Sequence, residues 1–409
     1  VFARPGWFNQ PSSLPFSLRD DNNSRAMNFG SKAKKKAGAF FRGLVRKSDN
    51  KTSTRERNTT SRKQLAASQR ETHTDGTQVE NSTRRQQTKK RHRKIKSRMD
   101  GDDSPIPPAK QAMRAFVEKT LEMGVQGILE EFAVIKKESQ SMDGIAKTEF
   151  DKHPGKNRYK DVFCIDSDRV VLTYPPGAPS DYIHANWTGT ADGRKHICTQ
   201  GPLASTVEDF WRLVWQEKAP AIVMLCNCIE ASKKKCEQYY PEEVDGEITS
   251  GTLTIQTKSK SDLENGVLLL SELSVSDGTE TMKVEHYQWV NWPDRGVPKE
   301  TRPCLTLIER FQRMSPVVIH CSAGIGRTGT IAGLDMLLTK LMKGEVATMK
   351  EILLDLRSHR HGSVQTDVQY LYMHKVILDI AVVKGAVKEA DIAEFFASYE
   401  QRSNTPTTF

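Results

Sequence analysis

The chain has 409 residues and a formal net charge of +10, with 61 Lys and Arg against 51 Asp and Glu. Residues 1–100 hold 25 basic and 8 acidic residues, so the rest of the chain carries a small acidic excess. This length allows one large core with an appended segment. No apolar run approaches the roughly 20 residues that a membrane-spanning helix needs, so we predict no transmembrane segment.

Residues 1–103 are rich in Arg, Lys, Ser, Thr, Gln and Asn, with few apolar residues after Phe41. Such a composition cannot bury enough surface to offset chain entropy, so we predict a disordered basic arm. Its basic clusters at 32–36 and 89–96 favour contact with nucleic acid, an anionic membrane or an acidic protein, or act as a nuclear address. An unselective solvated tail explains them equally well. The start has no signal-peptide pattern and no initiator Met, which leaves an upstream signal open.

The seven cysteines are scattered and odd in number, and they form no Cys-x-x-Cys pair. We therefore predict free thiols in a reducing compartment, rather than disulfides or zinc. The predicted location is cytoplasmic, with the nucleus as the alternative, and the predicted state is a monomer.

A globular region is expected over 104–390, with a C-terminal tail at 391–409. Apolar positions at helical spacing begin at 115–135, and strand-like and helical runs then alternate. Strands are predicted at 169–174, 196–200, 221–226, 251–257, 267–275, 282–290 and 316–320. Helices are predicted from a capping box at 205–208 to 215, and at 329–342, 347–357 and 366–383. This mixture predicts an α/β (α+β) fold, a highly twisted mixed sheet flanked by helices.

One segment combines the end of an apolar strand with the start of a helix. The apolar run 316–319 leads to His320, and apolar residues at helical spacing begin after Arg327. Small and glycine residues between them let backbone N–H groups converge on one point, and the helix N-terminus adds its positive end there. The sequence therefore predicts a cradle for a phosphoryl dianion. The residues of the cradle are Ser322, Ala323, Gly324, Ile325 and Gly326.

Cys321 lies at the base of this loop. A free thiol has a pKa of about 8.5, whereas thiols at helix N-termini fall to roughly 3.5–7.5, so we predict a thiolate nucleophile. Arg327 brings a planar fork that binds two phosphoryl oxygens. Thr328 places a hydroxyl near the sulfur, where it stabilises the thiolate as a leaving group. The alternative is an ordinary strand-to-helix turn with a buried cysteine.

A cysteine that displaces a phosphoryl group also needs an acid to protonate the leaving oxygen. The segment Trp292-Pro293-Asp294-Arg295-Gly296 forms a turn whose tip carries one carboxylate, Asp294, and Trp292 is a candidate hinge anchor. A lone aspartate in a loop is also a common turn-former, and the residues alone leave both readings open.

Together with further segments in the same order, these motifs resemble the tyrosine-specific, cysteine-dependent protein phosphatases of the non-receptor type. The resemblance covers about residues 125–385. The matching segments lie at 156–162, 181–186, 199–202, 210–215, 235–239, 292–294, 320–328 and 360–370. The resemblance implies the protein tyrosine phosphatase fold, catalysis with neither metal nor organic cofactor, and phosphotyrosine-containing proteins as partners.

The resemblance also implies how the substrate is held. Tyr159 would form the wall of a slot that is too deep for phosphoserine to reach the nucleophile. Asp161 would hold the peptide backbone of the substrate, with Lys160 as a neighbouring contact. Glu230 would pair with Arg327 and fix its fork.

Further implied roles concern the acid and the water. Lys235 would reach toward the loop of Asp294. Gln365 and Gln369 would position the water that hydrolyses a cysteinyl-phosphate, with Asp294 then acting as base.

The chain departs from the family pattern at Arg295, where an apolar residue is usual, and at His184, Cys164 and Asp367-Val368. None of these is a chemical group of the reaction, although Arg295 affects the expected substrate preference. Two alternatives stay open: a phosphotyrosine-binding module with reduced turnover, and a phosphatase of broader, lipid or dual specificity. Tyr159 argues against the second.

Overall fold

The computed structural model describes residues 106–139, 141 and 143–403, and the predicted basic arm lies outside them. Its helices are α3 (Pro108–Glu138), α4 (Thr148–Lys152), α5 (Val207–Gln216), α6 (Arg302–Phe311), α7 (Gly326–Met342), α8 (Met349–His359), α9 (Asp367–Val383) and α10 (Glu389–Ser403), with 3-10 turns at Pro154–Lys156 and Ala204–Thr206. Its strands are β1 (Arg169–Val171), β2 (Tyr182–Gly189), β3 (Lys195–Thr199), β4 (Ala221–Met224), β5 (Ile229–Glu230), β6 (Lys233–Lys234), β7 (Glu247–Ser250), β8 (Leu253–Asp262), β9 (Leu268–Ser276), β10 (Thr281–Trp289) and β11 (Val317–His320).

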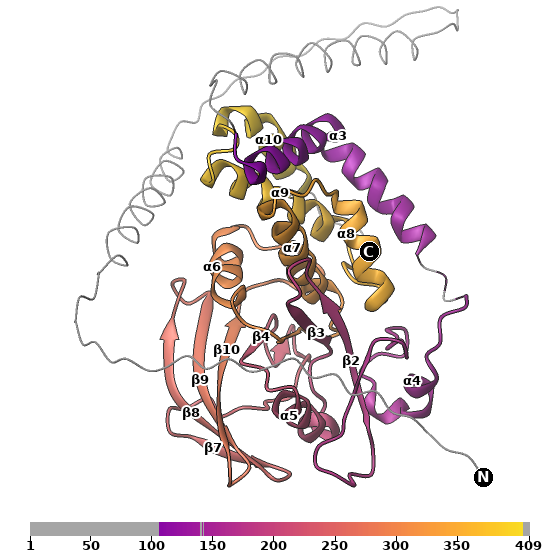
Figure 1. Ribbon diagram of the computed structural model, residues 1–409, viewed down its shortest axis with the longest axis vertical. Coiled ribbons are helices and arrows are strands. Elements are labelled where there is room, and N and C mark those ends of the chain that lie inside the picture. Colours follow the sequence, from indigo (N-terminus) through magenta and orange to yellow (C-terminus); the bar gives the residue numbers. More distant parts are fainter. Residues whose placement is uncertain (1–105, 140, 142, 404–409) are drawn as a thin grey trace, which may run out of the picture. The chain divides into compact units, whose positions relative to one another are not determined.

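Nine strands form one mixed sheet in the order β1-β2-β3-β11-β4-β10-β9-β8-β7, and β5 and β6 form a separate hairpin. The four central strands β3, β11, β4 and β10 run parallel, and the outer pairs are antiparallel. Helices α3, α7, α9 and α10 pack on one another, while β7 to β10 form a long meander away from them (Figure 1). The predicted mixed sheet with flanking helices is confirmed.

The strand that leads to the predicted cradle lies at the centre of the sheet. Strand β11 has both neighbours parallel, and all four of its residues are buried. A parallel strand that is covered on both faces is expected to be continuously apolar and β-branched, as Val317, Val318 and Ile319 are. Helix α7 follows and packs back on β3 and β11, so its N-terminus is fixed beneath the loop.

Several elements differ from the prediction. Strands β2 and β7 and helix α6 were not predicted, and the capping box at 205–208 is wrong. Helix α5 starts at Val207 without a side-chain cap, and the Thr206 hydroxyl instead accepts a hydrogen bond from the Leu203 N–H at 2.9 Å. Helix α6 carries an i, i+3, i+4 pattern, and its buried residues are Pro303, Cys304, Leu307, Ile308 and Phe311. That pattern was a usable signal in the sequence.

The segment expected as a tail, 391–409, is mostly helix. Helix α10 buries Ile392, Phe395 and Tyr399 and packs against α3 and α9. Long helix α3 is kinked at Gly124, whose φ of 63° lies in the left-handed region that favours glycine. The packed helices therefore extend to Ser403.

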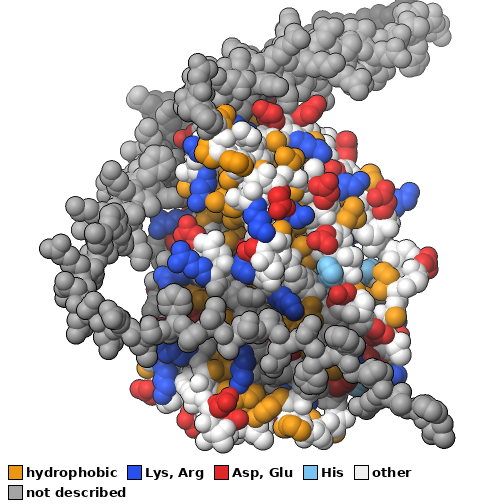
Figure 2. Space-filling view, viewed as in Figure 1, with side chains coloured by type: hydrophobic (Ala, Val, Ile, Leu, Met, Phe, Trp, Pro, Cys, Tyr) orange, Lys and Arg blue, Asp and Glu red, His pale blue; other side chains and the backbone are white. Residues whose placement is uncertain are grey.

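Among the described residues, no helix is long and apolar enough to cross a membrane. All seven cysteines are free, as predicted. Where Figure 2 shows described residues, Lys and Arg side chains lie among Asp and Glu side chains.

Candidate active site

The candidate site lies at one edge of the sheet. Because β3, β11, β4 and β10 are parallel, their carboxyl ends meet there, which is where open α/β sheets place ligands. Gln200 follows β3, Cys321 follows β11, Glu230 follows β4, and Asp294 follows β10. Four separate segments of the predicted site are thus brought together by the strand order.

The predicted cradle is a tight loop between β11 and α7. The N–H of Gly324 points at the Cys321 Sγ from 3.2 Å, and Cys321 is only 3% exposed. Gly324 has a φ of +70°, and a Cβ there would lie 2.1 Å from the Thr199 carbonyl oxygen. Only glycine fits this position, and its N–H stabilises negative charge on the sulfur.

A buried guanidinium supports the loop from behind. Arg360 Nε donates to the Gly324 carbonyl at 3.1 Å, and Nη2 donates to the Ala323 carbonyl at 3.2 Å. Because C=O and N–H of one peptide point in opposite directions, holding these carbonyls outward turns the N–H groups of Gly324 and Ile325 inward. No role for Arg360 was predicted from the sequence, although it lies in one of the matching segments.

His184 and Asn186 hold Arg360 in turn. His184 Nδ1 accepts from Arg360 Nη2 at 3.1 Å, its Nε2–H donates to the Val162 carbonyl at 2.9 Å, and Asn186 Oδ1 accepts from Arg360 Nη1 at 2.8 Å. Burial, together with the charge of Arg360, lowers the pKa of His184 to about 3. This histidine is therefore neutral at neutral pH and acts as an acceptor for Arg360.

His320 links the loop to a buried chain of polar rings. Its Nε2 lies 2.7 Å from the Tyr239 hydroxyl, which also lies 2.6 Å from His286 Nε2. Its Nδ1 lies 3.3 Å from the Cys321 carbonyl oxygen. Burial lowers the pKa of His320 to about 4, so a neutral ring with Nδ1–H donating to that carbonyl satisfies every contact.

Arg327 is fixed before any ligand arrives. Its Nη1 and Nη2 donate to the two carboxylate oxygens of Glu230 at 2.7 and 2.9 Å, and Nη1 also donates to the Trp292 carbonyl at 3.0 Å. The predicted pairing with Glu230 is therefore present. Burial alone would lower the pKa of Arg327, but the hydrogen bonds to Glu230 and the negative charges of Cys321 and Glu230 outweigh burial, and the pKa is raised.

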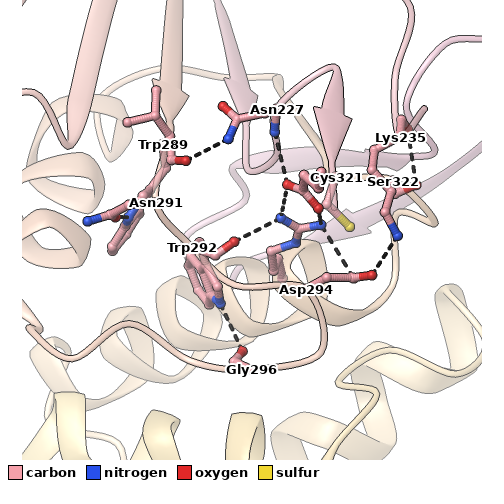
Figure 3. A network of polar contacts seen from close by, with 12 residues as sticks. Asn227, Lys235, Trp289, Asn291, Trp292, Asp294, Gly296, Cys321 and Ser322 are labelled. Atoms are coloured by element: carbon pink, nitrogen blue, oxygen red, sulfur yellow. Dashed lines mark hydrogen bonds and ion pairs between the residues drawn. The ribbon is translucent and has the colours of Figure 1, made fainter. Parts of the chain in front are cut away.

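Asp294 reaches the same place from the other side. Its Oδ1 lies 3.5 Å from Arg327 Nη2, and its Oδ2 lies 2.6 Å from Lys235 Nζ (Figure 3). The Trp292 indole N–H anchors the loop by donating to the Gly296 carbonyl at 3.0 Å. Burial raises the pKa of Asp294, but Lys235 and Arg327 outweigh it and hold the pKa below its usual range. This carboxyl is thus ionised at neutral pH in the unliganded protein.

The wall of the predicted slot is tied to the cradle. The Tyr159 hydroxyl lies 2.9 Å from the Ser322 hydroxyl, which also donates to the Lys235 carbonyl at 3.0 Å. The neighbouring Arg158 donates its backbone N–H to Gln200 Oε1 at 2.9 Å. Asp161 is exposed on the surface two residues after Tyr159, outside these contacts.

The two predicted glutamines lie over the start of α7. A Cβ at Gly326 would lie 3.2 Å from Gln365 Oε1 and from both side-chain polar atoms of Gln369. Gln369 Oε1 accepts from the backbone N–H of Gln365 at 3.0 Å and of Thr366 at 3.3 Å. The Thr366 hydroxyl donates to the Arg295 carbonyl at 3.1 Å, which ties the glutamine turn to the loop of Asp294.

Two buried polar groups at the site have no protein partner. Within the described part of the chain, neither the Thr328 hydroxyl nor Gln369 Nε2 makes a hydrogen bond. Buried polar groups are usually satisfied, and exceptions cluster where function requires them. Both groups are available to the sulfur, a water or a ligand.

One group of possible metal ligands occurs among the described residues. Atoms of Cys226, Cys236 and His320 lie within 4.8 Å of one another, and all three residues are buried. Both ring nitrogens of His320 already take part in the hydrogen bonds to Tyr239 and Cys321. A metal ion there would have to replace one of these bonds.

Comparisons with known proteins show the family to which the chain belongs. The family model for protein-tyrosine phosphatase matches residues 153–379, so the chain belongs to that family. This range contains the loop of Cys321, the loop of Asp294 and both glutamines.

Individual relatives are similar over the same region. Receptor-type tyrosine-protein phosphatase eta of Gallus gallus is 32% identical over 71% of this chain and 22% of its own length. Tyrosine-protein phosphatase non-receptor type 9 of Rattus norvegicus is 33% identical over 71% of this chain and 52% of its own length. The chain thus spans about half of the second relative and about a fifth of the first.

A solved structure of PTPN18 in complex with HER2 phosphopeptides is 31% identical, with a TM-score of 0.62 over 66% of this chain and 99% of that one. This similarity supports the fold described above.

Proposed function

We propose that this chain hydrolyses phosphotyrosine in proteins through a cysteinyl-phosphate intermediate. The observation that carries the proposal is the meeting of Arg327 and Asp294 at 3.5 Å above the loop of Cys321. Nucleophile, phosphate ligand and acid thereby surround one point. The PTPN18 phosphopeptide complex supports the same substrate class.

In the first step the Cys321 thiolate attacks phosphorus in line with the tyrosyl oxygen, and the P–O bond breaks as the S–P bond forms. The loop N–H groups, Arg327 Nε–H and the Nη2–H that now faces Asp294 take the phosphoryl oxygens. Asp294 gives its proton to the departing phenolate. A bound phosphoryl dianion disfavours the charged carboxylate nearby, so it raises the pKa of Asp294 toward the value that an acid needs.

In the second step a water attacks the phosphorus of the cysteinyl-phosphate. Gln365 and Gln369 hold this water, and Asp294 accepts its proton. The S–P bond breaks, phosphate leaves, and the thiolate returns, stabilised by the Gly324 N–H and by the hydroxyl of Thr328. The proton given in the first step is recovered in the second, so the cycle closes without a redox change.

Selectivity for tyrosine follows from the slot beside Tyr159. The ring of the substrate stacks on Tyr159, and its length brings the phosphorus down to Cys321. A phosphoserine side chain is too short to span the same depth. Asp161, exposed at the rim, holds the substrate backbone N–H groups.

The test is phosphate release by the full chain from a phosphotyrosine peptide and a matched phosphothreonine peptide. We expect release from the first alone and none from Cys321→Ser, while Cys304→Ser, a buried cysteine on α6, stays active. Tight binding of phosphotyrosine peptide without release would support a binding module instead. Equal turnover of both peptides would support a phosphatase of broader specificity.

Three further expectations remain proposals. The catalytic domain spans about 104–390 with α10 packed on it, and the chain acts as a monomer in the cytoplasm or nucleus. Residues 1–103 contact an anionic partner, which predicts salt-sensitive binding to nucleic acid or anionic vesicles that is lost on deletion of residues 1–100.

A further inference from the structure

Helix α10 returns along α9 and ends beside the glutamine turn. Near its C-terminus, Arg402 Nη2 lies 2.8 Å from Asp367 Oδ2, at the first residue of α9. Further along, the Lys375 amine of α9 lies 4.8 Å from the centre of the Phe396 ring and 5.8 Å from that of Tyr399. The C-terminal helix is therefore attached to α9 near its start as well as along its length.

Asp367 lies inside the turn that carries both glutamines. The Thr366 hydroxyl accepts the Gln369 N–H at 3.3 Å and thereby caps α9, while Gln369 Oε1 accepts the N–H groups of Gln365 and Thr366. Residues 365–369 thus form one hydrogen-bonded unit, and Asp367 is its contact with α10. The carboxylate also accepts its neighbour's N–H, from Val368 at 2.9 Å, and lies at the positive end of the helix.

The two partners of this ion pair are partly shielded from water. The Arg402 side chain is 24% exposed and that of Asp367 is 32% exposed. A pair of this kind contributes modestly to folding, but it restricts where the turn can sit. The inner side of the same turn faces Gly326 at the start of α7, where the glutamine side chains lie.

We propose that Arg402 is a positioning residue, which acts through Asp367 to hold Gln365 and Gln369 in place for hydrolysis of the cysteinyl-phosphate. This inference rests on the proposed function and deepens it. It assigns the C-terminal helix to the second step, in which both glutamines hold the attacking water.

The two steps are separable by kinetics. With para-nitrophenyl phosphate, the first step releases para-nitrophenol and the second releases phosphate. When hydrolysis limits turnover, slowing it lowers kcat and KM in the same proportion and leaves kcat/KM unchanged, because kcat/KM reports only the steps up to cysteinyl-phosphate formation. A general loss of fold lowers kcat/KM as well.

The experiment compares the full chain with Arg402→Ala, Arg402→Lys and Asp367→Asn by stopped-flow and steady-state kinetics. For Arg402→Ala and Asp367→Asn we expect hydrolysis slowed roughly threefold, a larger burst of para-nitrophenol and an unchanged kcat/KM. Arg402→Lys retains the charge and restores most of the rate. Glu400→Ala, an exposed neighbour on α10, serves as the matched control and behaves like the unmodified chain.

Contrary outcomes separate this inference from the proposed function. An active unmodified chain with an unchanged burst and kcat in Arg402→Ala would overturn the inference alone. A fall in kcat/KM together with a lower melting temperature would assign Arg402 a merely structural role and overturn it as well. If the unmodified chain releases no para-nitrophenol, the proposed function fails first, and the inference falls with it.

Discussion

The loop of Cys321 and the loop of Asp294 face the same point but are held in different ways. The Cys321 loop is buried, and the side chain of Arg327 is 2% exposed, with backbone and side-chain partners on every side. The side chain of Asp294 is 41% exposed and is held by the charges of Lys235 and Arg327. The first loop is set by packing, whereas the second is set by electrostatics that a ligand can change.

Under the proposed function, this difference suits the two loops to different tasks. A phosphate cradle stabilises a transition state best when its donors need no rearrangement, and burial provides that. An acid must change protonation within each cycle, and partial exposure beside charges that a ligand can offset allows it. Variants that alter either loop test this division.

The largest effect is expected at Asp294. Asp294→Ala and Asp294→Asn should lower kcat by about 10²–10⁴-fold with little change in the free energy of unfolding, because the residue is exposed. In the unmodified enzyme, the rate of the first step falls as pH rises through the pKa of Asp294 in the complex, since the acid loses its proton. The variants lack that fall, which single-turnover rates of phosphoryl transfer measured across pH will show.

Removing the partner of Arg327 should lower both the stability of the protein and its kcat/KM, because Arg327 belongs to the buried loop. Glu230→Ala leaves a buried guanidinium without its carboxylate, so we expect a loss of about 3–5 kcal/mol in unfolding free energy, together with a large drop in kcat/KM. Urea unfolding and steady-state kinetics measure both. Glu237→Ala, whose partner Lys234 is exposed, is the control and should cost less than about 1 kcal/mol. Equal effects in the two variants would contradict the comparison.

The network behind the cradle should make stability depend on pH. The unfolded chain protonates His184 below about pH 6.5, whereas the folded chain keeps this histidine neutral down to about pH 3. Stability is therefore lost as pH falls below about 6.5, by up to about 1.4 kcal/mol per pH unit for this residue. His184→Asn keeps an acceptor for Arg360 but does not titrate, so its unfolding free energy should fall less between pH 6.5 and pH 4.

The smallest effect on turnover is expected from a substitution of Lys235. Lys235→Met removes a charge that lowers the pKa of Asp294, so the alkaline fall in the single-turnover rate of the first step should move to higher pH. The change in kcat at neutral pH should stay below about tenfold. Lys234→Met, in an exposed pair beside it, should leave the profile in place. A profile that does not move in Lys235→Met would mean that Arg327 and Arg295 set the pKa of Asp294 without Lys235.

Much of the site was predictable because its residues follow strand ends. The run to His320, the glycine at 324 and the loop of Asp294 are local patterns, and parallel strands with a common edge bring them together. The supports were not predictable in this way. Arg360 acts on carbonyl groups 36 and 37 positions away in the chain, and nothing in its local sequence indicates those partners.

The same distinction, between local patterns and distant partners, separates the strands that were predicted from those that were not. Buried central strands such as β11 are continuously apolar and were predicted, whereas β2 was not, because polar side chains interrupt its buried run. Those polar residues, His184 and Asn186, are buried because they hold Arg360, a reason that lies outside the strand itself. Helix α10 has only three buried residues, so its sequence is mostly polar and its apolar pattern was too weak to predict a helix.

The bond between the Tyr159 and Ser322 hydroxyls has a consequence for how a substrate would be measured. Selection by side-chain length requires a fixed distance between the rim of the slot and the sulfur of Cys321. Here the wall of the proposed slot, Tyr159, is bonded to Ser322, the residue next to Cys321, so we expect the wall and the sulfur to move together. Selection of tyrosine by length would thus depend on the bond between Tyr159 and Ser322, whereas the acid chemistry depends on the charges around Asp294.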